Sequence, residues 1–178
     1  MSGLEYTINQ MKVGDIILFQ TRGFKGLAIY LATQSDFTHA GLYIGNGVMA
    51  ESDFGGTQIN LLSHKYRDTP FEVLRHKTAN EKQLDNVKLW ALKNNGKGYD
   101  YLGVLGITLS IIGKDKHNSY DVLDRYWCSE YVMDAYISSG LEVSCDKDTH
   151  IVSPGDISED KNFFSVCRYI LTDKKISL

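Results

Sequence analysis

Short runs of β-branched and aromatic residues crowd the first half of this sequence, and they are the feature that most limits its fold. The runs are divided by Gly, Asn and Pro, residues that favour turns over continued strands. The second half carries longer segments with the apolar spacing of helices. Strands gathered early and helices later are typical of an α+β domain, in which a sheet packs against helices. Strands are predicted at 13–20, 37–44, 48–52, 57–61, 71–77 and 162–171, and helices at 24–34, 81–95 and 125–140, with a further apolar helix after Asp100.

Length and charge narrow the class of protein. A chain of 178 residues fits one domain spanning 1–178, which would bury roughly 70% of its surface. The net charge is −3 and no basic run exceeds two residues, so a nucleic-acid partner is not expected.

The longest apolar run, 101–112, is shorter than the roughly 20 residues that span a bilayer, so no transmembrane segment is expected. Residues 1–12 lack the pattern of a signal peptide, which favours a cytoplasmic protein and is equally compatible with a phage protein or one exported by another route. The pattern does not indicate an oligomeric state.

One of the three cysteines stands apart from the others. Cys128 opens the amphipathic segment "RYWCSEYVMDAYISSG" (125–140), whereas Cys145 is placed in a loop and Cys167 in a strand. An odd number of cysteines without a CxxC pair favours free thiols. The positive end of a helix favours a thiolate at its first residue, so Cys128 is a candidate nucleophile, with simple packing as the alternative. Glu130 and Asp134 are predicted to form an exposed pair on this helix.

A nucleophilic cysteine requires a base, and His39 is the strongest candidate. Alternation in the strand "FTHAGLYI" places His39, Gly41 and Tyr43 on one face. The glycine would leave an open place beside the ring where another group can approach. A histidine that is merely buried in the core would fit the same pattern. The other histidines are expected in polar loops (His64 and His117), at the surface (His76) and at the edge of a site (His150).

The segments "GDI", "SDFTHAGLYIG", "GKGYDY", "YWCSEYV" and "SPGDI" occur in an order that carries a family resemblance. The sequence resembles the permuted papain-like amidases, the YaeF/YiiX branch of the NlpC superfamily, which is related to lecithin retinol acyltransferase. In ordinary NlpC-type enzymes the cysteine helix precedes the histidine strand, and here the histidine comes first. The resemblance runs from about Val13 to Ile170. It implies a papain-like α+β fold with an antiparallel sheet packed against helices.

The resemblance also implies roles for individual residues. Cys128 matches the nucleophile and His39 the general base, with Glu51 as the carboxylate that orients the imidazole ring. Asp53 is the rival for that third role. Tyr99 matches a tyrosine whose hydroxyl would lie beside the oxyanion of the reaction intermediate.

The turn between the strands 37–44 and 48–52 decides whether Glu51 can reach His39. A two-residue Asn46-Gly47 turn pairs Leu42 with Glu51 and directs the carboxylate to the far face. A three-residue loop from Gly45 to Gly47, or an equivalent bulge, pairs Gly41 with Glu51 and brings the carboxylate to the face of His39. We predict the second register, with a hydrogen bond between Glu51 and His39. That register sets Asp53 opposite His39 as well.

These residues predict a cysteine hydrolase that cleaves an amide or peptide bond through a Cys-His-Glu triad and a thioester intermediate. An acyltransferase or lipase acting on lipid esters is the alternative, with the 101–112 segment against the acyl chain, and a non-catalytic binding module is a third possibility. The expected partner is therefore a small amide, peptide or lipid-like substrate. No metal or other cofactor is expected, because the sequence has no HxH, HExxH or CxxC motif.

Overall fold

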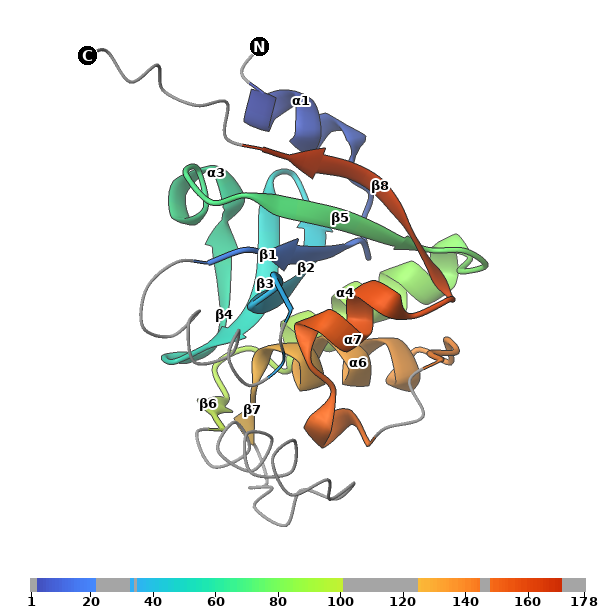
Figure 1. The fold of residues 1–178 in the computed structure, drawn as a ribbon. Coiled ribbons are helices and arrows are strands. Elements are labelled where there is room, and N and C mark those ends of the chain that lie inside the picture. Colours follow the sequence, from blue (N-terminus) through green and yellow to red (C-terminus); the bar gives the residue numbers. More distant parts are fainter. Residues whose placement is uncertain (1–2, 22–32, 34, 101–124, 145–147, 171–178) are drawn as a thin grey trace, which may run out of the picture.

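The computed structural model describes residues 3–21, 33, 35–100, 125–144 and 148–170 of the chain. Within these residues, six strands form one antiparallel sheet in the order β4-β3-β2-β1-β5-β8 (Figure 1). A short parallel pair, β6 and β7, forms a separate two-stranded sheet beside β4. The strands of the large sheet are β1 (Ile16–Phe19), β2 (His39–Gly45), β3 (Val48–Asp53), β4 (Gly56–Leu61), β5 (Phe71–His76) and β8 (Phe163–Tyr169), and the small pair is β6 (Gly98–Tyr99) and β7 (Arg125–Tyr126).

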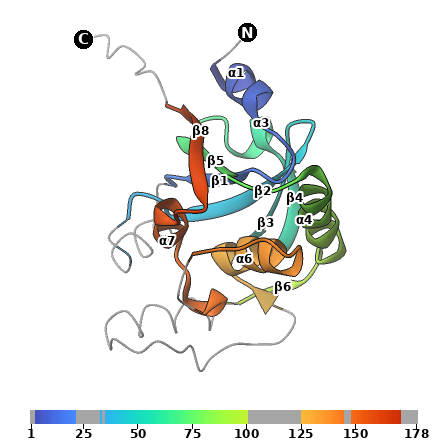
Figure 2. The same cartoon turned by 90° about the vertical axis from the view of Figure 1, so that its right-hand side faces the viewer.

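Helices bury both faces of the sheet. Against one face pack α4 (Glu81–Lys93), α6 (Cys128–Ser138) and α7 (Pro154–Glu159). The three helices lie close together in Figure 1, and the turned view of Figure 2 shows α6 between α7 and α4. Residues of α1 (Gly3–Gln10) and α3 (Leu62–Lys65) cover the other face. A one-turn 3₁₀ helix, η1 (Thr149–Ile151), lies between α6 and α7 in the sequence.

The strand β1 shows why the sheet requires two covering layers. Its sequence "IILF" is apolar at every position, and all four side chains are fully buried. Ile16 and Leu18 belong to the core under α4 and α6, whereas Ile17 and Phe19 belong to the core under α1 and α3. Alternating apolar side chains therefore supply both cores from a single central strand.

The helix ends are set by local side-chain hydrogen bonds. Asn80 caps α4 by accepting from the backbone N–H of Gln83, and the Gln83 side chain accepts from the backbone N–H of Asn80. Ser153 and Asp156 form the same reciprocal arrangement at α7, where Pro154 begins the helix. Such capping boxes satisfy N–H groups that the first turn of a helix leaves without partners.

Most of the predicted elements are present, with ends shifted by a few residues. The strand predicted at 13–20 is shortened to 16–19, and the helix predicted over 125–140 occupies 128–138. Sequence reasoning missed α1, α3 and α7, because a helix of one or two turns is too short for its apolar spacing to be recognised. The predicted helices at 24–34 and after Asp100 lie outside the described residues, apart from single positions at their edges.

Candidate active site

The β2–β3 hairpin adopts the predicted register. Gly41 pairs with Glu51, and an extra residue on the β2 side, at Ile44, forms a bulge. The turn itself is Asn46-Gly47, whose φ angles of 54° and 72° suit a tight hairpin turn with two left-handed residues. The structure thus combines a two-residue turn with a bulge, which has the same effect on register as a three-residue loop. His39 and Glu51 lie on the same face of the hairpin.

Glu51 lies at the centre of a saturated hydrogen-bond network. Its side chain is fully buried, and its Oε2 lies 2.6 Å from His39 Nε2, as the register predicted. Tyr66 donates its hydroxyl to the same oxygen at 2.6 Å. The second oxygen, Oε1, accepts from Asn60 Nδ2 and Lys65 Nζ, both at 2.7 Å. Each carboxylate oxygen therefore has two donors, which is the arrangement that a buried anion requires.

The pKa of Glu51 reflects this network. Burial alone would raise the pKa, but the hydrogen bond and charge of His39 and the ammonium group of Lys65 outweigh it and lower the pKa to about 2. Glu51 is therefore ionised throughout the neutral range.

His39 is held between this carboxylate and the cysteine. Burial would lower the pKa of the imidazole, but hydrogen bonds to Cys128 and Glu51 and the negative charges of both groups raise it to about 10. Because Nε2 is bound to Glu51, Nδ1 is the ring nitrogen left for Cys128. The ring centroids of Phe19 and Tyr66 lie 5.8 Å and 6.0 Å from the centroid of the imidazole. The His39 ring is therefore held by packing as well as by hydrogen bonding.

Cys128 is the first residue of α6 and is almost fully buried. It belongs to a small apolar cluster with Tyr99, Trp127 and Ile151, against which Phe54 packs. The rings of Phe54 and Tyr99 stack with centroids 4.8 Å apart. As the first residue of a helix, Cys128 has a backbone N–H with no acceptor inside that helix. The structure thus places the predicted nucleophile, its base and the predicted oxyanion tyrosine together.

Asp53 lies on the same face but is bound elsewhere. Its Oδ2 accepts from Lys65 Nζ at 2.9 Å, and its Oδ1 accepts from the backbone N–H of Phe54 at 2.8 Å. Burial would raise the pKa of Asp53, but these donors and the charge of His39 lower it. The hydrogen bond to His39 is made by Glu51.

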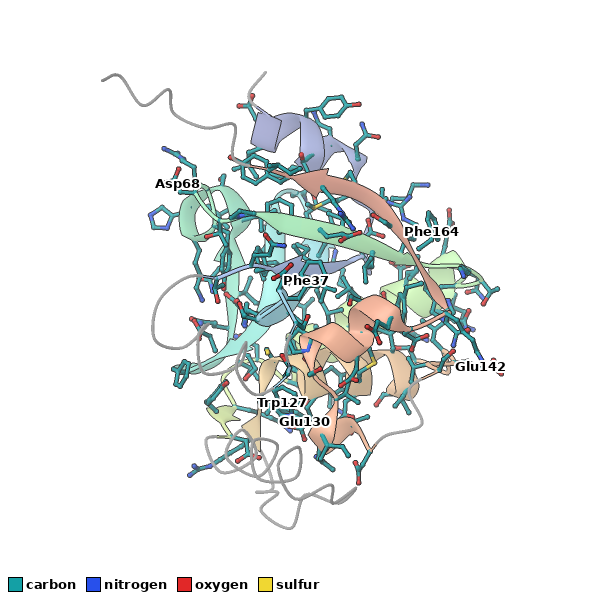
Figure 3. All side chains as sticks on the ribbon, viewed as in Figure 1. Phe37, Asp68, Trp127, Glu130, Glu142 and Phe164 are labelled. Atoms are coloured by element: carbon teal, nitrogen blue, oxygen red, sulfur yellow. The ribbon has the colours of Figure 1, made fainter. Side chains whose placement is uncertain are left out.

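The expectation of an exposed Glu130–Asp134 pair is wrong. Glu130 is buried, and its carboxylate accepts from the backbone N–H of Trp127 at 3.2 Å and lies 2.6 Å from His150 Nδ1. Figure 3 shows Trp127 and Glu130 close together at the start of α6. Burial, with the nearby charge of Asp134, raises the pKa of Glu130 to about 7 against the opposing effect of His150. The 3₁₀ helix η1 covers this part of α6, which sequence periodicity could not show.

The expectation of a surface position for His76 is also wrong, because the side chain is buried and packs on Tyr136 and Phe163. At Gly41 another group does come close, as expected, and that group is the Met49 side chain: an added methyl group on Gly41 would lie 2.2 Å from its terminal carbon. His117 and Cys145 lie outside the described residues.

Sequence reasoning did not identify the three donors that hold Glu51 besides His39. Asn60 could have been predicted from the sequence. In the β3–β4 pairing Gln58 lies opposite Glu51, and Asn60, two residues along the strand, is on the same face of the sheet. Lys65 and Tyr66 lie in and just after α3, a one-turn helix that no local pattern indicated.

Among the described residues, no three His, Cys, Asp or Glu side chains are grouped closely enough to hold a metal ion. In the same part of the chain, no helix has the length and apolar character needed to cross a membrane.

The amino-acid sequence was compared with protein families and with curated proteins. No protein-family model matches the chain. The chain is 25% identical over 179 residues to the probable lipoprotein peptidase YaeF of Escherichia coli K12, an alignment that covers 86% of this chain and 65% of that protein. The chain therefore spans somewhat less than two thirds of its curated relative.

The crystal structure of the metalloprotein YiiX from Escherichia coli O157:H7 has a similar fold, with a TM-score of 0.65 and 20% sequence identity. The match covers 90% of this chain and 98% of that one. The predicted α+β, papain-like fold is confirmed, and the two comparisons support a relationship of the YaeF/YiiX type.

Proposed function

We propose that this protein is a cysteine hydrolase that cleaves an amide or peptide bond, with Cys128 as nucleophile, His39 as general base and acid, and Glu51 as the orienting carboxylate. The observation that carries the proposal is the buried 2.6 Å hydrogen bond between His39 and Glu51, with Cys128, the first residue of α6, close enough to the same imidazole to raise its pKa. Three features support these roles: the thiol begins a helix, the imidazole lies close to it, and an ionised carboxylate is bound to the other side of the ring.

Proton transfer in this arrangement passes through one nitrogen of the ring. Glu51 accepts the Nε2–H of His39, which leaves Nδ1 to take the proton from the Cys128 thiol. The resulting imidazolium is stabilised by the ionised carboxylate and in turn stabilises the thiolate by charge. Glu51 itself stays ionised, because its pKa of about 2 is far below that of the ring.

The thiolate then attacks the carbonyl carbon of the substrate, forming a C–S bond and a tetrahedral oxyanion. The backbone N–H of Cys128 and the hydroxyl of Tyr99 are the donors proposed for that oxyanion. His39 next protonates the leaving amine as the C–N bond breaks, which leaves a thioester on Cys128. A water molecule that His39 deprotonates attacks the thioester, releasing the acid and restoring the thiol.

A peptide or another amide is the favoured substrate class. The curated relative is named a probable peptidase, and the fold is shared with a papain-like protein. An ester or thioester of a lipid would use the same residues, so the acyl group must be identified by experiment.

The test is to incubate the protein with a panel of peptides, simple amides and phospholipids and to trap the adduct by rapid acid quench and mass spectrometry. We expect a mass increase on the Cys128 peptide that equals the acyl part of a peptide or amide substrate. The Cys128→Ala variant is the control and should show neither adduct nor product. A fatty-acyl mass would instead establish the acyltransferase or lipase alternative, and the absence of any adduct across the panel would favour a binding module.

A further inference from the structure

Lys65 bridges two carboxylates that both face the histidine. Its Nζ lies 2.7 Å from Glu51 Oε1 and 2.9 Å from Asp53 Oδ2. The Glu51 side chain is fully buried, whereas those of Lys65 and Asp53 are 26% and 28% exposed. The ammonium group of Lys65 thus pairs with two carboxylates, one fully buried (Glu51) and one partly exposed to solvent (Asp53).

The hairpin register makes Asp53 a real competitor for His39. Because Gly41 pairs with Glu51, Asp53 lies two residues further along β3, at the position across from His39. Residues two apart on a strand share a face, so both carboxylates are directed to the side of the imidazole. The charge of His39 already contributes to lowering the pKa of Asp53. Asp53 is nevertheless held by Lys65 and by the N–H of Phe54.

We propose that Lys65 is a positioning residue that assigns these two carboxylates their roles: it draws Asp53 away from His39 and holds Glu51 in place as the partner of the ring. The inference rests on the proposed function of Cys128 and His39. Lys65 touches neither reacting group, and it acts through the carboxylates alone.

The charges around Lys65 agree with this role. Burial would lower the pKa of its ammonium group, but Glu51 and Asp53 outweigh burial and raise the pKa, so the group stays charged throughout the neutral range. Without that charge, Glu51 would keep His39, Asn60 and Tyr66 as donors, and Asp53 would keep the N–H of Phe54 alone. Asp53, the less buried and less restrained of the two, would then be free to turn toward the imidazolium.

The experiment measures the rate at which iodoacetamide alkylates Cys128 between pH 5 and 9, by mass spectrometry of the Cys128 peptide. This readout needs no substrate. We expect Glu51→Gln to slow alkylation at neutral pH by about tenfold or more and Asp53→Asn by less than about twofold. Lys65→Met should slow it by about fivefold, and Lys65→Arg, which keeps the charge and the donors, should stay within about twofold of the wild type.

The decisive comparison introduces Asp53→Asn into two proteins, the wild type and the Lys65→Met variant. With Met at position 65, Asp53 should be recruited to the ring, so that Asp53→Asn now slows alkylation by about fivefold. A purely structural role for Lys65 would leave the effect of Asp53→Asn the same in the two backgrounds, and that result would overturn the proposal. Lys82→Met, on the exposed side of α4, is the matched control. If Lys65→Met does not fold, Lys65→Gln, which keeps a donor but loses the charge, takes its place in the same comparison.

The two proposals fail in different ways. If His39→Ala leaves the alkylation of Cys128 unchanged in a folded protein, the proposed catalytic pair is wrong. If His39→Ala slows alkylation but substitutions at Lys65 change neither the rate nor the effect of Asp53→Asn, the catalytic pair stands and the role given to Lys65 is wrong.

Discussion

Replacing Glu51 with Gln should destabilise the protein in a way that depends on pH. The substitution keeps the shape of the side chain and removes its charge, so it imitates the protonated carboxyl group. In the wild type the pKa of Glu51 is about 2, well below its ordinary value of 4.5, because His39 and Lys65 outweigh the effect of burial. A group whose pKa is lowered by folding stabilises the folded state wherever it is ionised.

The size of the effect follows from the two pKa values. One pKa unit corresponds to about 1.4 kcal/mol, so the lowering from 4.5 to about 2 makes ionised Glu51 worth about 3 kcal/mol at pH 7. This contribution is fully present above pH 4.5 and is lost as the pH falls through 2. By linkage, about half of it should remain at pH 3. The Glu51→Gln variant lacks it at every pH.

Urea unfolding followed by tryptophan fluorescence at pH 7, 5, 4 and 3 measures the free energy of unfolding of both proteins. We expect the variant to be less stable by about 3 kcal/mol at pH 7 and by about half as much at pH 3. Asp85→Asn, an exposed change on α4, should differ from the wild type by less than about 0.5 kcal/mol throughout. A deficit for Glu51→Gln that is equal at pH 7 and pH 3 would refute the reasoning, because the contribution of Glu51 would then not come from its charge.

Three other predictions concern the same site. Iodoacetamide at mildly acidic pH should modify Cys128 well before Cys167, whose pKa is raised by burial, and His39→Ala should slow the reaction at Cys128; equal labelling of both thiols would contradict the nucleophile assignment. Tyr66→Phe removes a hydroxyl that donates to the buried carboxylate, so urea unfolding should show a loss of about 1.5–3 kcal/mol, and an unchanged midpoint would show that the hydroxyl contributes nothing. Gly41→Ala adds a methyl group where a methionine side chain already lies, so thermal unfolding should show a loss of about 1–3 kcal/mol, and a more stable variant would mean that the core has room there.

The strand-rich first half and the cysteine helix could be predicted because the signals are local. Alternating apolar residues mark strands, and turn-forming residues mark their ends. The Gly45-Asn46-Gly47 segment belongs to this class as well, since a hairpin of so few residues has only two registers that differ in which face Glu51 takes. That register allows the hydrogen bond between His39 and Glu51, because it brings the carboxylate to the face of the imidazole.

What the sequence by itself determined is therefore the α+β class, the hairpin and the cysteine at the start of a helix. The tertiary structure decided which of the two carboxylates binds the imidazole, because the register brings both to the face of His39. Lys65, in a one-turn helix beyond the next strand, binds both carboxylates, but only Glu51 is fully buried and also held by Asn60 and Tyr66. The tertiary structure also decided that Glu130 is buried, since the 3₁₀ helix that covers it follows twenty residues later. The local sequence pattern shows whether a segment forms a helix or a strand and which of its faces is apolar. The burial and ionisation of a side chain depend on the distant segment that packs against it, and the residues around that side chain contain no information about which segment this is.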